Sequence, residues 1–355
     1  MKKITTTVLI ATIFSMASAF AQGGTTGPLT WVLENGTLTI SGEGEMPDYF
    51  LDNDGPYTTI PWYSYRLSIN TVVIETGVTS IGHSAFPNCD NMISITIPNS
   101  VISIGGNVFF RCISLISINI PKSVTNIALQ TFWYCQNLTS IDVEIENNNY
   151  TSENGVLFNK DKTTLIFYPE GKIGSYVISN STTSIEYCAF ESCNNLTSIT
   201  IPKSVISIGK FAFSNCFSLT TMTNLNPEPV DIKNLYVFSP TIPVNCTLQV
   251  PIDAVEGYRN APVWQDFNIV GIEVGIENIE TTDINIYPNP TTGELKIENG
   301  ELKINNIEIY DLMGKKLSFF NSQISIIDIS HFSAGVYFLL ITTENGVITR
   351  KIEKK

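Results

Sequence analysis

Charged residues and histidines are scarce in this sequence, and their scarcity argues against several functions. Charged residues make up 15% of the 355 positions, and the two histidines are His83 and His331. A catalytic triad in the body of the chain would have to use His83. The equivalent positions of the repeated phrases described below hold glycine, leucine, tyrosine and lysine. Because such different side chains are accepted there, we expect a solvated surface position and no histidine-dependent enzyme.

Long apolar runs are also lacking, apart from one at the start of the chain. Two lysines precede the apolar run 8–20, which ends in an A-x-A site. This order is typical of a signal peptide and predicts cleavage between Ala21 and Gln22. A retained anchor helix is the alternative, but the run is shorter than the roughly 20 residues of a membrane span. We expect residues 1–21 to be removed and the mature chain to be exported, with no transmembrane segment.

Positive charge is scarce in the body of the chain. The formal charge of the whole sequence is −13, residues 284–355 sum to zero and residues 1–21 carry +2, which leaves −15 on residues 22–283. Nucleic-acid partners are therefore disfavoured, because phosphate backbones attract basic surfaces. The acidity either keeps an exported protein soluble or forms an acidic binding face, and we favour the first interpretation.

What the sequence does contain is a phrase that recurs every 23 residues. Cys89, Cys112 and Cys135 are 23 apart, and so are Cys193 and Cys216. An earlier copy without cysteine is expected to begin near residue 69. Four other series keep the 23-residue step except for one step of 58 between their third and fourth members: Phe86, Phe109, Phe132, Phe190 and Phe213; Ile81, Ile104, Ile127, Ile185 and Ile208; Met92, Leu115, Leu138, Leu196 and Leu219; and Ile95, Ile118, Ile141, Ile199 and Met222.

Each copy contains L-x-x-I-x-I-P, whose alternation predicts a short strand with one buried face. The proline ends the strand, and the following segment should return the chain by a turn and a short helical or extended stretch. One coil alone buries too little apolar surface to offset the entropy of ordering it, so the coils must stack. The sequence therefore predicts a mainly β fold, a leucine-rich-repeat solenoid of 23-residue coils with a parallel sheet on one face.

An insertion of 35 residues, 144–178, interrupts the period. Two apolar runs, 156–158 and 164–168, flank the polar stretch 159–162 and predict a hairpin with a four-residue connection. Residues 176–179 are expected to supply another strand of the solenoid.

The phrases SITIPNSVISIGGNVFFRC and LTSITIPKSVISIGKFAFSNC resemble the BspA-type leucine-rich repeat family over roughly residues 55–222. The opening phrase LTWVLENGTLTISGEGEMPDY, with a hairpin signal at Asn35-Gly36, looks like the N-terminal cap found ahead of such repeats. Residues 247–272 look like a terminal cap. The resemblance implies a surface protein of adhesion and interaction.

The last 73 residues follow another pattern, with short alternating strands that predict a small C-terminal β-sandwich. The phrases IYPNPTTGEL, IEIYDLMGKKL, IDISHFSAGVYFLLI and RKIEKK resemble the type A sorting domain of the type IX secretion system. The resemblance implies passage through the outer membrane and release or surface attachment; an accessory sandwich is the alternative. The sorting-motif residues are Pro288, Asn289, Pro290, Gly293, Gly335, Tyr337 and Lys351.

The expected organisation follows from these patterns. It comprises a signal peptide at 1–21, an N-terminal β cap at 22–68, repeats at 69–225 with the insertion at 144–178, a C-terminal cap at 226–274, a linker at 275–282 and the sorting domain at 283–355.

The cysteines of the ladder are expected to be small buried apolar residues. Stacked coils would place their Cβ atoms roughly 4.8 Å apart, beyond the range of about 3.5–4.5 Å that a disulfide needs. A linear ladder also fails to converge on a zinc ion. The stretch 52–55 partly matches a calcium loop, but Tyr63 stands where that loop needs a glutamate. We expect no metal and no cofactor, and the states of Cys188 and Cys246 stay open.

Two surface features are candidates for binding. The outward residues of the strands should form a polar stripe: Ser94, Thr96, Ser117, Asn119, Ser140, Asp142, Ser198 and Thr200. An aromatic cluster of Phe110, Trp133 and Tyr134 stands where other copies hold small polar groups. These aromatic side chains either anchor a partner or are covered by the insertion, and the second alternative is favoured.

We therefore predict a secreted or cell-surface, non-catalytic protein that binds protein or glycan partners through its solenoid. A structural surface-layer or matrix component is one alternative, and a carbohydrate-active enzyme that uses carboxylates alone is another. The expected partners are an extracellular protein or glycan and, through the C-terminal domain, the type IX secretion machinery.

Overall fold

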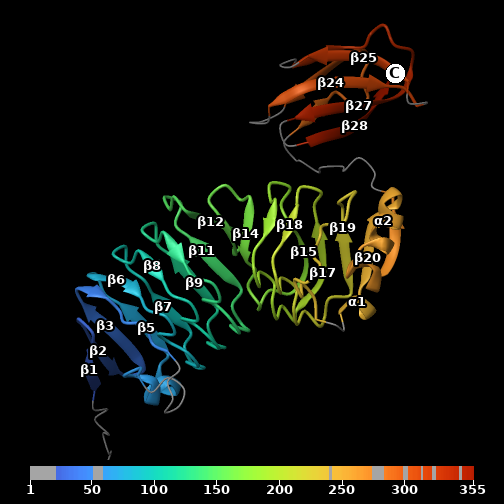
Figure 1. The fold of residues 1–355 in the computed structure, drawn as a ribbon. Helices are drawn as coiled ribbons and strands as arrows, with labels where there is room; N and C mark the ends of the chain where they lie inside the picture. Colours follow the sequence, from blue (N-terminus) through green and yellow to red (C-terminus); the bar gives the residue numbers. More distant parts are fainter. Residues whose placement is uncertain are drawn as a thin grey trace, which may run out of the picture. The chain divides into compact units, whose positions relative to one another are not determined.

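The chain forms two compact units, residues 1–272 and 273–355 (Figure 1). The computed structural model describes residues 21–50, 59–239, 242–273, 284–298, 303–312, 315–321, 325–343 and 346–355. Residues 1–20 of the expected signal peptide, the linker and the calcium-like stretch 52–55 lie outside the described residues. The domain boundaries drawn from the sequence stay predictions.

Three antiparallel strands open the first unit: β1 (Gln22–Thr26), β2 (Leu29–Glu34) and β3 (Thr37–Gly42). The predicted turn between β2 and β3 is confirmed, because Asn35 and Gly36 adopt φ angles of 50° and 79°. β3 then pairs in parallel with β5 (Thr71–Ile74), so the hairpin covers the first coil of the stack.

The predicted parallel sheet, here called the main sheet, is built from one strand of each coil. Ser140 pairs with Ser117 and Ser198 pairs with Thr221, so neighbouring strands are offset by the 23 residues of the period. The solenoid prediction is confirmed. Its strands after β5 are β7 (Ser94–Thr96), β9 (Ser117–Ile120), β11 (Ser140–Val143), β15 (Gly174–Val177), β17 (Leu196–Ile201), β19 (Thr221–Asn224), β20 (Thr247–Pro251) and β21 (Asn268–Ile272). Strand pairing is broken between β7 and β9 and between β11 and β15.

The returning segment of each coil forms a second set of short parallel strands, here called the second ladder. The sequence predicted only a turn and a short helical or extended stretch, but each return supplies ladder hydrogen bonds that its buried backbone needs. The strands lie in two runs, before and after the insertion. They are β4 (Gly44–Glu45), β6 (Val78–Ile81), β8 (Ser103–Ile104) and β10 (Asn126–Ile127), then β14 (Thr164–Phe167), β16 (Ser184–Ile185) and β18 (Ser207–Ile208).

Like side chains stack into columns inside the coils. The ring centres of Phe109 and Phe132 are 5.7 Å apart, and those of Phe190 and Phe213 are 4.9 Å apart. The insertion supplies the ring that ends each half of the column, since Phe167 packs on Phe132 at 5.5 Å and Tyr168 packs on Phe190 at 5.0 Å. The buried residues form two clusters that divide at the insertion, and each cluster holds its own coils in register.

The five ladder cysteines are free and buried, which confirms their prediction as small core residues, and Cys188 and Cys246, whose states the sequence left open, are free and buried as well. The thiol of Cys112 donates a hydrogen bond to the Phe86 carbonyl at 3.1 Å, and Cys216 donates to the Phe190 carbonyl at 2.9 Å. Burial raises the pKa of Cys216 to about 12, so its thiol is not a nucleophile at neutral pH.

The insertion contains the predicted hairpin, formed by β13 (Val156–Asn159) and β14. The sequence missed a third strand, β12 (Tyr150–Glu153), which pairs antiparallel with β13. Its Tyr150 hydroxyl accepts the backbone N–H of Ile127 at 3.0 Å, where the second ladder would otherwise have an open edge. The strand expected at residues 176–179 is found two residues earlier, as β15, which pairs in parallel with β17.

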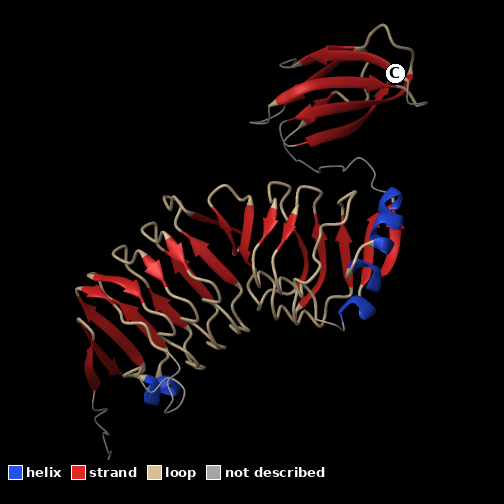
Figure 2. Ribbon diagram, in the orientation of Figure 1, coloured by secondary structure: helices blue, strands red, loops and turns tan. Residues whose placement is uncertain are grey.

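Figure 2 shows that helices lie at the two ends of the solenoid. At the N-terminal end is the 3₁₀ helix η1 (Tyr63–Ser68). At the other end α1 (Ile242–Asn245), η2 (Ile252–Ala254), α2 (Val255–Asn260) and η3 (Trp264–Asp266) surround β20 and β21. Among the described residues, no helix has the length and apolar character that a membrane crossing requires.

The second unit is a two-sheet sandwich around one shared core, as predicted. One sheet holds β22 (Asn285–Tyr287), β23 (Glu294–Glu298) and β26 (Ile326–Asp328). The other holds β24 (Ile304–Tyr310), β25 (Lys316–Asn321), β27 (Gly335–Thr343) and β28 (Gly346–Lys354).

Candidate functional site

The predicted polar stripe lies on the outer face of the main sheet. Of its members, Ser94, Thr96, Ser117, Asn119 and Asp142 are exposed, whereas Ser140, Ser198 and Thr200 are half-buried. Strand register brings Ser140 beside Ser117 and Asp142 beside Asn119, while Ser198 and Thr200 lie on β17 beyond the insertion.

Most of the stripe is free to meet another molecule. The hydroxyl of Ser140 donates to Asp142 at 2.8 Å, and the hydroxyl oxygens of Ser94 and Thr71 lie 3.3 Å apart. The side chains of Thr96 and Asn119 form no hydrogen bond with other residues that the structure describes. Small hydroxyl and amide groups in register offer both donors and acceptors along the sheet.

A hollow of about 530 Å³ lies where the insertion interrupts the main sheet, between β11 and β15. Thr139, just before β11, and Ser175 of β15 line it, together with Lys172 and Asn154 from the segment between these strands. The Lys172 ammonium donates to the Asn154 carbonyl at 2.7 Å. Partial burial lowers the pKa of Lys172, which is consistent with its position in the wall of the hollow.

The structure brings the three predicted aromatic residues together. The Tyr134 ring lies 5.6 Å from that of Phe110 and 5.6 Å from that of Trp133. All three side chains are half-buried. Tyr134 donates its backbone N–H to a carboxylate oxygen of Glu170 at 2.7 Å, and the Trp133 indole donates to Glu191 at 2.7 Å. The cluster thus contacts both the end of the insertion and the next coil.

Sequence reasoning missed the two buried carboxyl groups under this cluster. The side chains of Glu170 and Glu191 are 2% and 7% exposed. Burial raises the pKa of Glu170 to about 8 and, with a weaker effect, raises the pKa of Glu191. No sequence signal marked them, because their partners lie 36 and 58 residues away. Their hydrogen bonds hold the Tyr134 backbone and the Trp133 indole in place.

A second aromatic row was also missed. Tyr187, Phe211 and Tyr236 succeed one another at ring distances of 5.9 and 6.1 Å, and the Lys210 ammonium lies 4.8 Å from the centre of the Phe211 ring. The Tyr236 side chain is 69% exposed. The sequence signal for this row is the spacing of the three aromatic residues, which are 24 and 25 positions apart. Because these steps differ from the 23-residue period, the row was not recognised as part of the repeat.

His83 departs from its expected solvated position. Its side chain is half-buried, stacks on the Phe50 ring at 5.3 Å and lies 2.8 Å from the Ser84 hydroxyl. Among the described residues, no group of three or more His, Cys, Asp and Glu side chains is arranged to hold a metal ion.

In the second unit, sorting-motif residues from the beginning and the end of this unit's own sequence contact each other. The Asn289 amide donates to the Lys351 carbonyl at 2.9 Å and accepts the N–H of Glu353 at 2.9 Å. Pro288 and Pro290 flank Asn289 with cis peptide bonds. The remaining motif residues serve the fold: a side chain at Gly293 would strike Ser330, Gly335 begins β27, and the Tyr337 hydroxyl donates to the Ser333 carbonyl.

The family follows from the repeat and the sandwich together. The BspA type leucine rich repeat region matches residues 58–170 and 164–243, in six copies, and the secretion system C-terminal sorting domain matches residues 285–355. The chain belongs to the BspA-type leucine-rich repeat family. Its sorting domain directs export across the outer membrane to the cell surface or the extracellular space.

Individual relatives are more distant. A leucine-rich repeat protein from Eubacterium ventriosum is 26% identical, with a TM-score of 0.42 over 71% of this chain and 85% of that one. A leucine rich cell surface protein from Faecalibacterium prausnitzii is 20% identical, with a TM-score of 0.34 over 72% of this chain and 96% of that one. An endo-acting ulvan lyase from Formosa agariphila is 28% identical over 87 residues, which span 24% of this chain and 17% of that protein.

Proposed function

We propose that this exported repeat protein is a non-catalytic binding module whose main binding face is the polar stripe of the main sheet. The observation that carries the proposal is the contrast between the two sides of each strand. Inward positions such as Ile118 and Ile141 repeat and are fully buried, whereas Asn119 and Asp142 beside them differ and face outward. Outward side chains that differ from coil to coil, on a backbone that the buried residues hold constant, are suited to selecting a partner.

The aromatic cluster supports the same function. Aromatic side chains supply large contact areas at low entropic cost, and Phe110 and Tyr134 are half-exposed at the turn that ends the coil. The buried carboxyl groups of Glu170 and Glu191 fix Tyr134 and Trp133 in place. Protein and glycan partners both fit such a mixed polar and aromatic surface.

Two other functions predict different behaviour. A structural surface-layer component would self-associate without saturable binding to foreign molecules. A carboxylate-dependent enzyme would need two carboxyl groups across an accessible cleft. Glu170 and Glu191 are buried beneath side chains instead, so this arrangement favours binding.

The test is capture by the exported chain on arrays of extracellular proteins and glycans, followed by a binding isotherm for each partner captured. We expect saturable binding to at least one partner by a monodisperse protein. Self-association without any such binding would favour the structural component. Turnover of a polysaccharide that an Asp or Glu substitution abolishes would overturn the non-catalytic proposal.

A further inference from the structure

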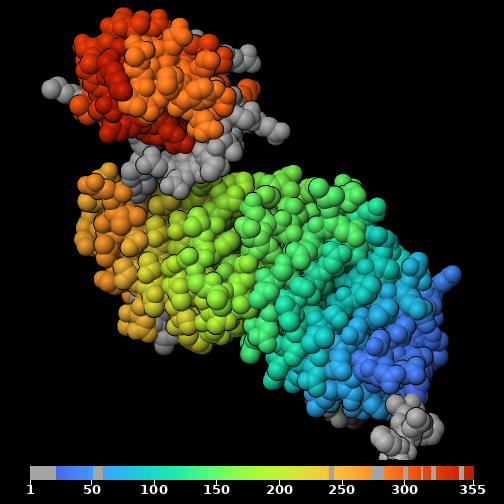
Figure 3. Space-filling view, turned by 180° about the vertical axis from the view of Figure 1, so that it is seen from behind, coloured from blue at the N-terminus to red at the C-terminus, as the bar shows by residue number. Residues whose placement is uncertain are grey.

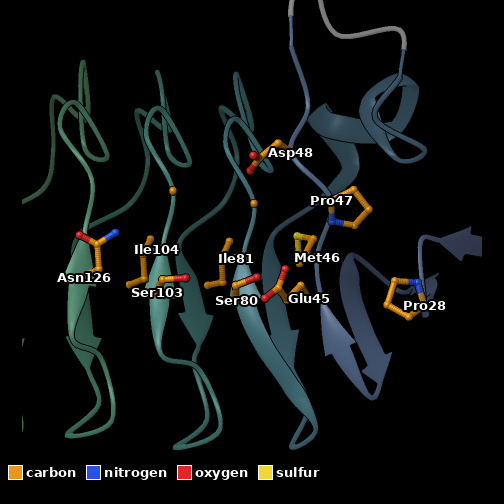
Figure 4. A pocket seen from close by; sticks show the side chains of 12 residues that line it. Pro28, Glu45, Met46, Pro47, Asp48, Ser80, Ile81, Ser103, Ile104 and Asn126 are labelled. Atoms are coloured by element: carbon orange, nitrogen blue, oxygen red, sulfur yellow. The ribbon is translucent and has the colours of Figure 1, made fainter.

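A polar groove crosses the outer side of the second ladder near the N-terminal end of the solenoid (Figure 4). Its volume is about 630 Å³, within the roughly 300–1,000 Å³ that ligand sites occupy. Ser80, Ser103 and Asn126 project from β6, β8 and β10, and Glu45 projects from β4 beside them. Strand register places all four side chains at one level, so they form a continuous row.

The four side chains of this row lack partners. None of them makes a hydrogen bond or ion pair with another residue among those that the structure describes. Each serine hydroxyl and the Asn126 amide both donate and accept, and the Glu45 carboxylate accepts. At roughly 4.8 Å per strand the row extends about 14 Å, the reach of a short oligomer with a polar group on each unit.

Charge limits which ligand fits the groove. Glu45 and Asp48 line it, and no lysine, arginine or histidine does. The Asp48 carboxylate already accepts the His83 backbone N–H at 2.7 Å. Residues 22–283 as a whole carry −15. An anionic ligand would therefore be repelled, and a neutral ligand rich in hydroxyl groups would not.

The backbone at this end of the ladder leaves little room for a peptide to add a strand. The backbone N–H groups of Gly44 and Met46 already donate to Gly77 and Ser80. A Cβ on Gly44 would lie 3.1 Å from the Pro28 ring, so Pro28 covers the outer edge of β4, and the next position, Pro47, has no N–H. These contacts favour recognition through the row of side chains over strand addition.

We propose that this groove binds a short neutral oligosaccharide laid along the row from Glu45 to Asn126. The Ser80 and Ser103 hydroxyl groups and the Asn126 amide exchange hydrogen bonds with sugar hydroxyl groups, and Glu45 accepts one at the end of the row. The site lies on the second ladder, away from the polar stripe. It goes beyond the proposed function by assigning a second ligand and its chemical class.

The test is isothermal titration of the exported chain with cellotriose, xylotriose, maltotriose and mannotriose, and with trigalacturonate as the anionic comparison. We expect at least one neutral trisaccharide to bind and trigalacturonate not to bind. Ser103→Trp fills the middle of the groove and should weaken binding about tenfold or more. Ser207→Trp, at the matching position on β18, is the control and should leave affinity unchanged.

A second variant, Asn126→Arg at the exposed end of the row, is used if Ser103→Trp disturbs the fold. We expect it to weaken binding to a similar extent. Absence of binding by every neutral trisaccharide, or equal affinity of both groove variants and the control, overturns the proposal. Capture of array partners that is unaffected by the groove variants would leave the proposed function standing while this site fails. If neither the array capture nor the trisaccharide titration shows binding, both the proposed function and the groove site are overturned.

Discussion

Glu170 should make the stability of the solenoid depend on pH. Its side chain is 2% exposed, and a carboxylate oxygen accepts the Tyr134 N–H at 2.7 Å. Burial, with a smaller contribution from Glu191, raises its pKa from 4.5 to about 8. Because the folded-state pKa lies above the unfolded one, folding favours the protonated acid. The stability is fully present below about pH 4.5 and is lost as the pH rises through 8.

The magnitude follows from the same values. At about 1.4 kcal/mol for each pH unit, the free energy of unfolding should fall by roughly 3–4 kcal/mol between pH 5 and pH 8. Urea titration followed by tryptophan fluorescence measures this fall for the solenoid alone, because all four tryptophans lie before residue 273. Glu170→Gln should remove most of the slope and leave the smaller part that comes from Glu191.

The control for this experiment is Glu146→Gln, an exposed glutamate of the same insertion that should keep the slope of the unsubstituted protein. Equal stability of the unsubstituted protein at pH 5 and pH 8 would refute the reasoning. So would a Glu170→Gln protein that still loses about 3 kcal/mol over this range.

Two substitutions and one deletion test the packing of the solenoid and the role of the sorting domain. Phe109→Ala should cost about 3–5 kcal/mol in urea unfolding, because it empties the middle of the ring column, whereas exposed Phe217→Ala should cost under about 0.5 kcal/mol; equal costs would contradict the column. Gly82→Val should lower the melting temperature by several degrees, since a Cβ there would lie 1.9 Å from the Pro47 carbonyl oxygen, and an unchanged calorimetric trace would show that the cap does not pack there. Deletion of residues 283–355 should leave the protein in the periplasm, as cell fractionation would detect; normal surface display would contradict the role of the sorting domain.

The stacking of the coils could be predicted from the sequence because the repeat spacing determines it. A 23-residue step that returns Phe109 to Phe132 and Cys112 to Cys135 specifies which side chains stack. In the space-filling view of Figure 3 the colours, which follow residue number, succeed one another along the solenoid. The outward direction of Asn119 and Asp142 follows from the same strand alternation.

Structural features that do not follow the 23-residue period could not be predicted from the sequence. Strand β12 has the sequence YTSE, which carries no apolar alternation, and it exists because β13 offers it a partner. The second ladder strands β8 and β10 are two residues long, too short for any periodic signal. The Glu170 contact with Tyr134 joins the insertion to a coil, and the groove joins Glu45 of the cap to three coils. Such sites arise from tertiary packing between segments with no common spacing.

The central claim is that the outer face of the main sheet binds a partner while the inner face only sets the shape. The most direct measurement is the affinity for the array-captured partner of a chain carrying lysine at Thr96, Asn119 and Asp142. Its control carries the same three lysines on exposed positions of or beside the second ladder: Thr125, Thr183 and Ser207.

We predict that lysines on the stripe weaken binding about tenfold or more, with an unchanged unfolding midpoint, and that the control lysines do not. Saturable binding of equal strength by both variants would contradict the claim.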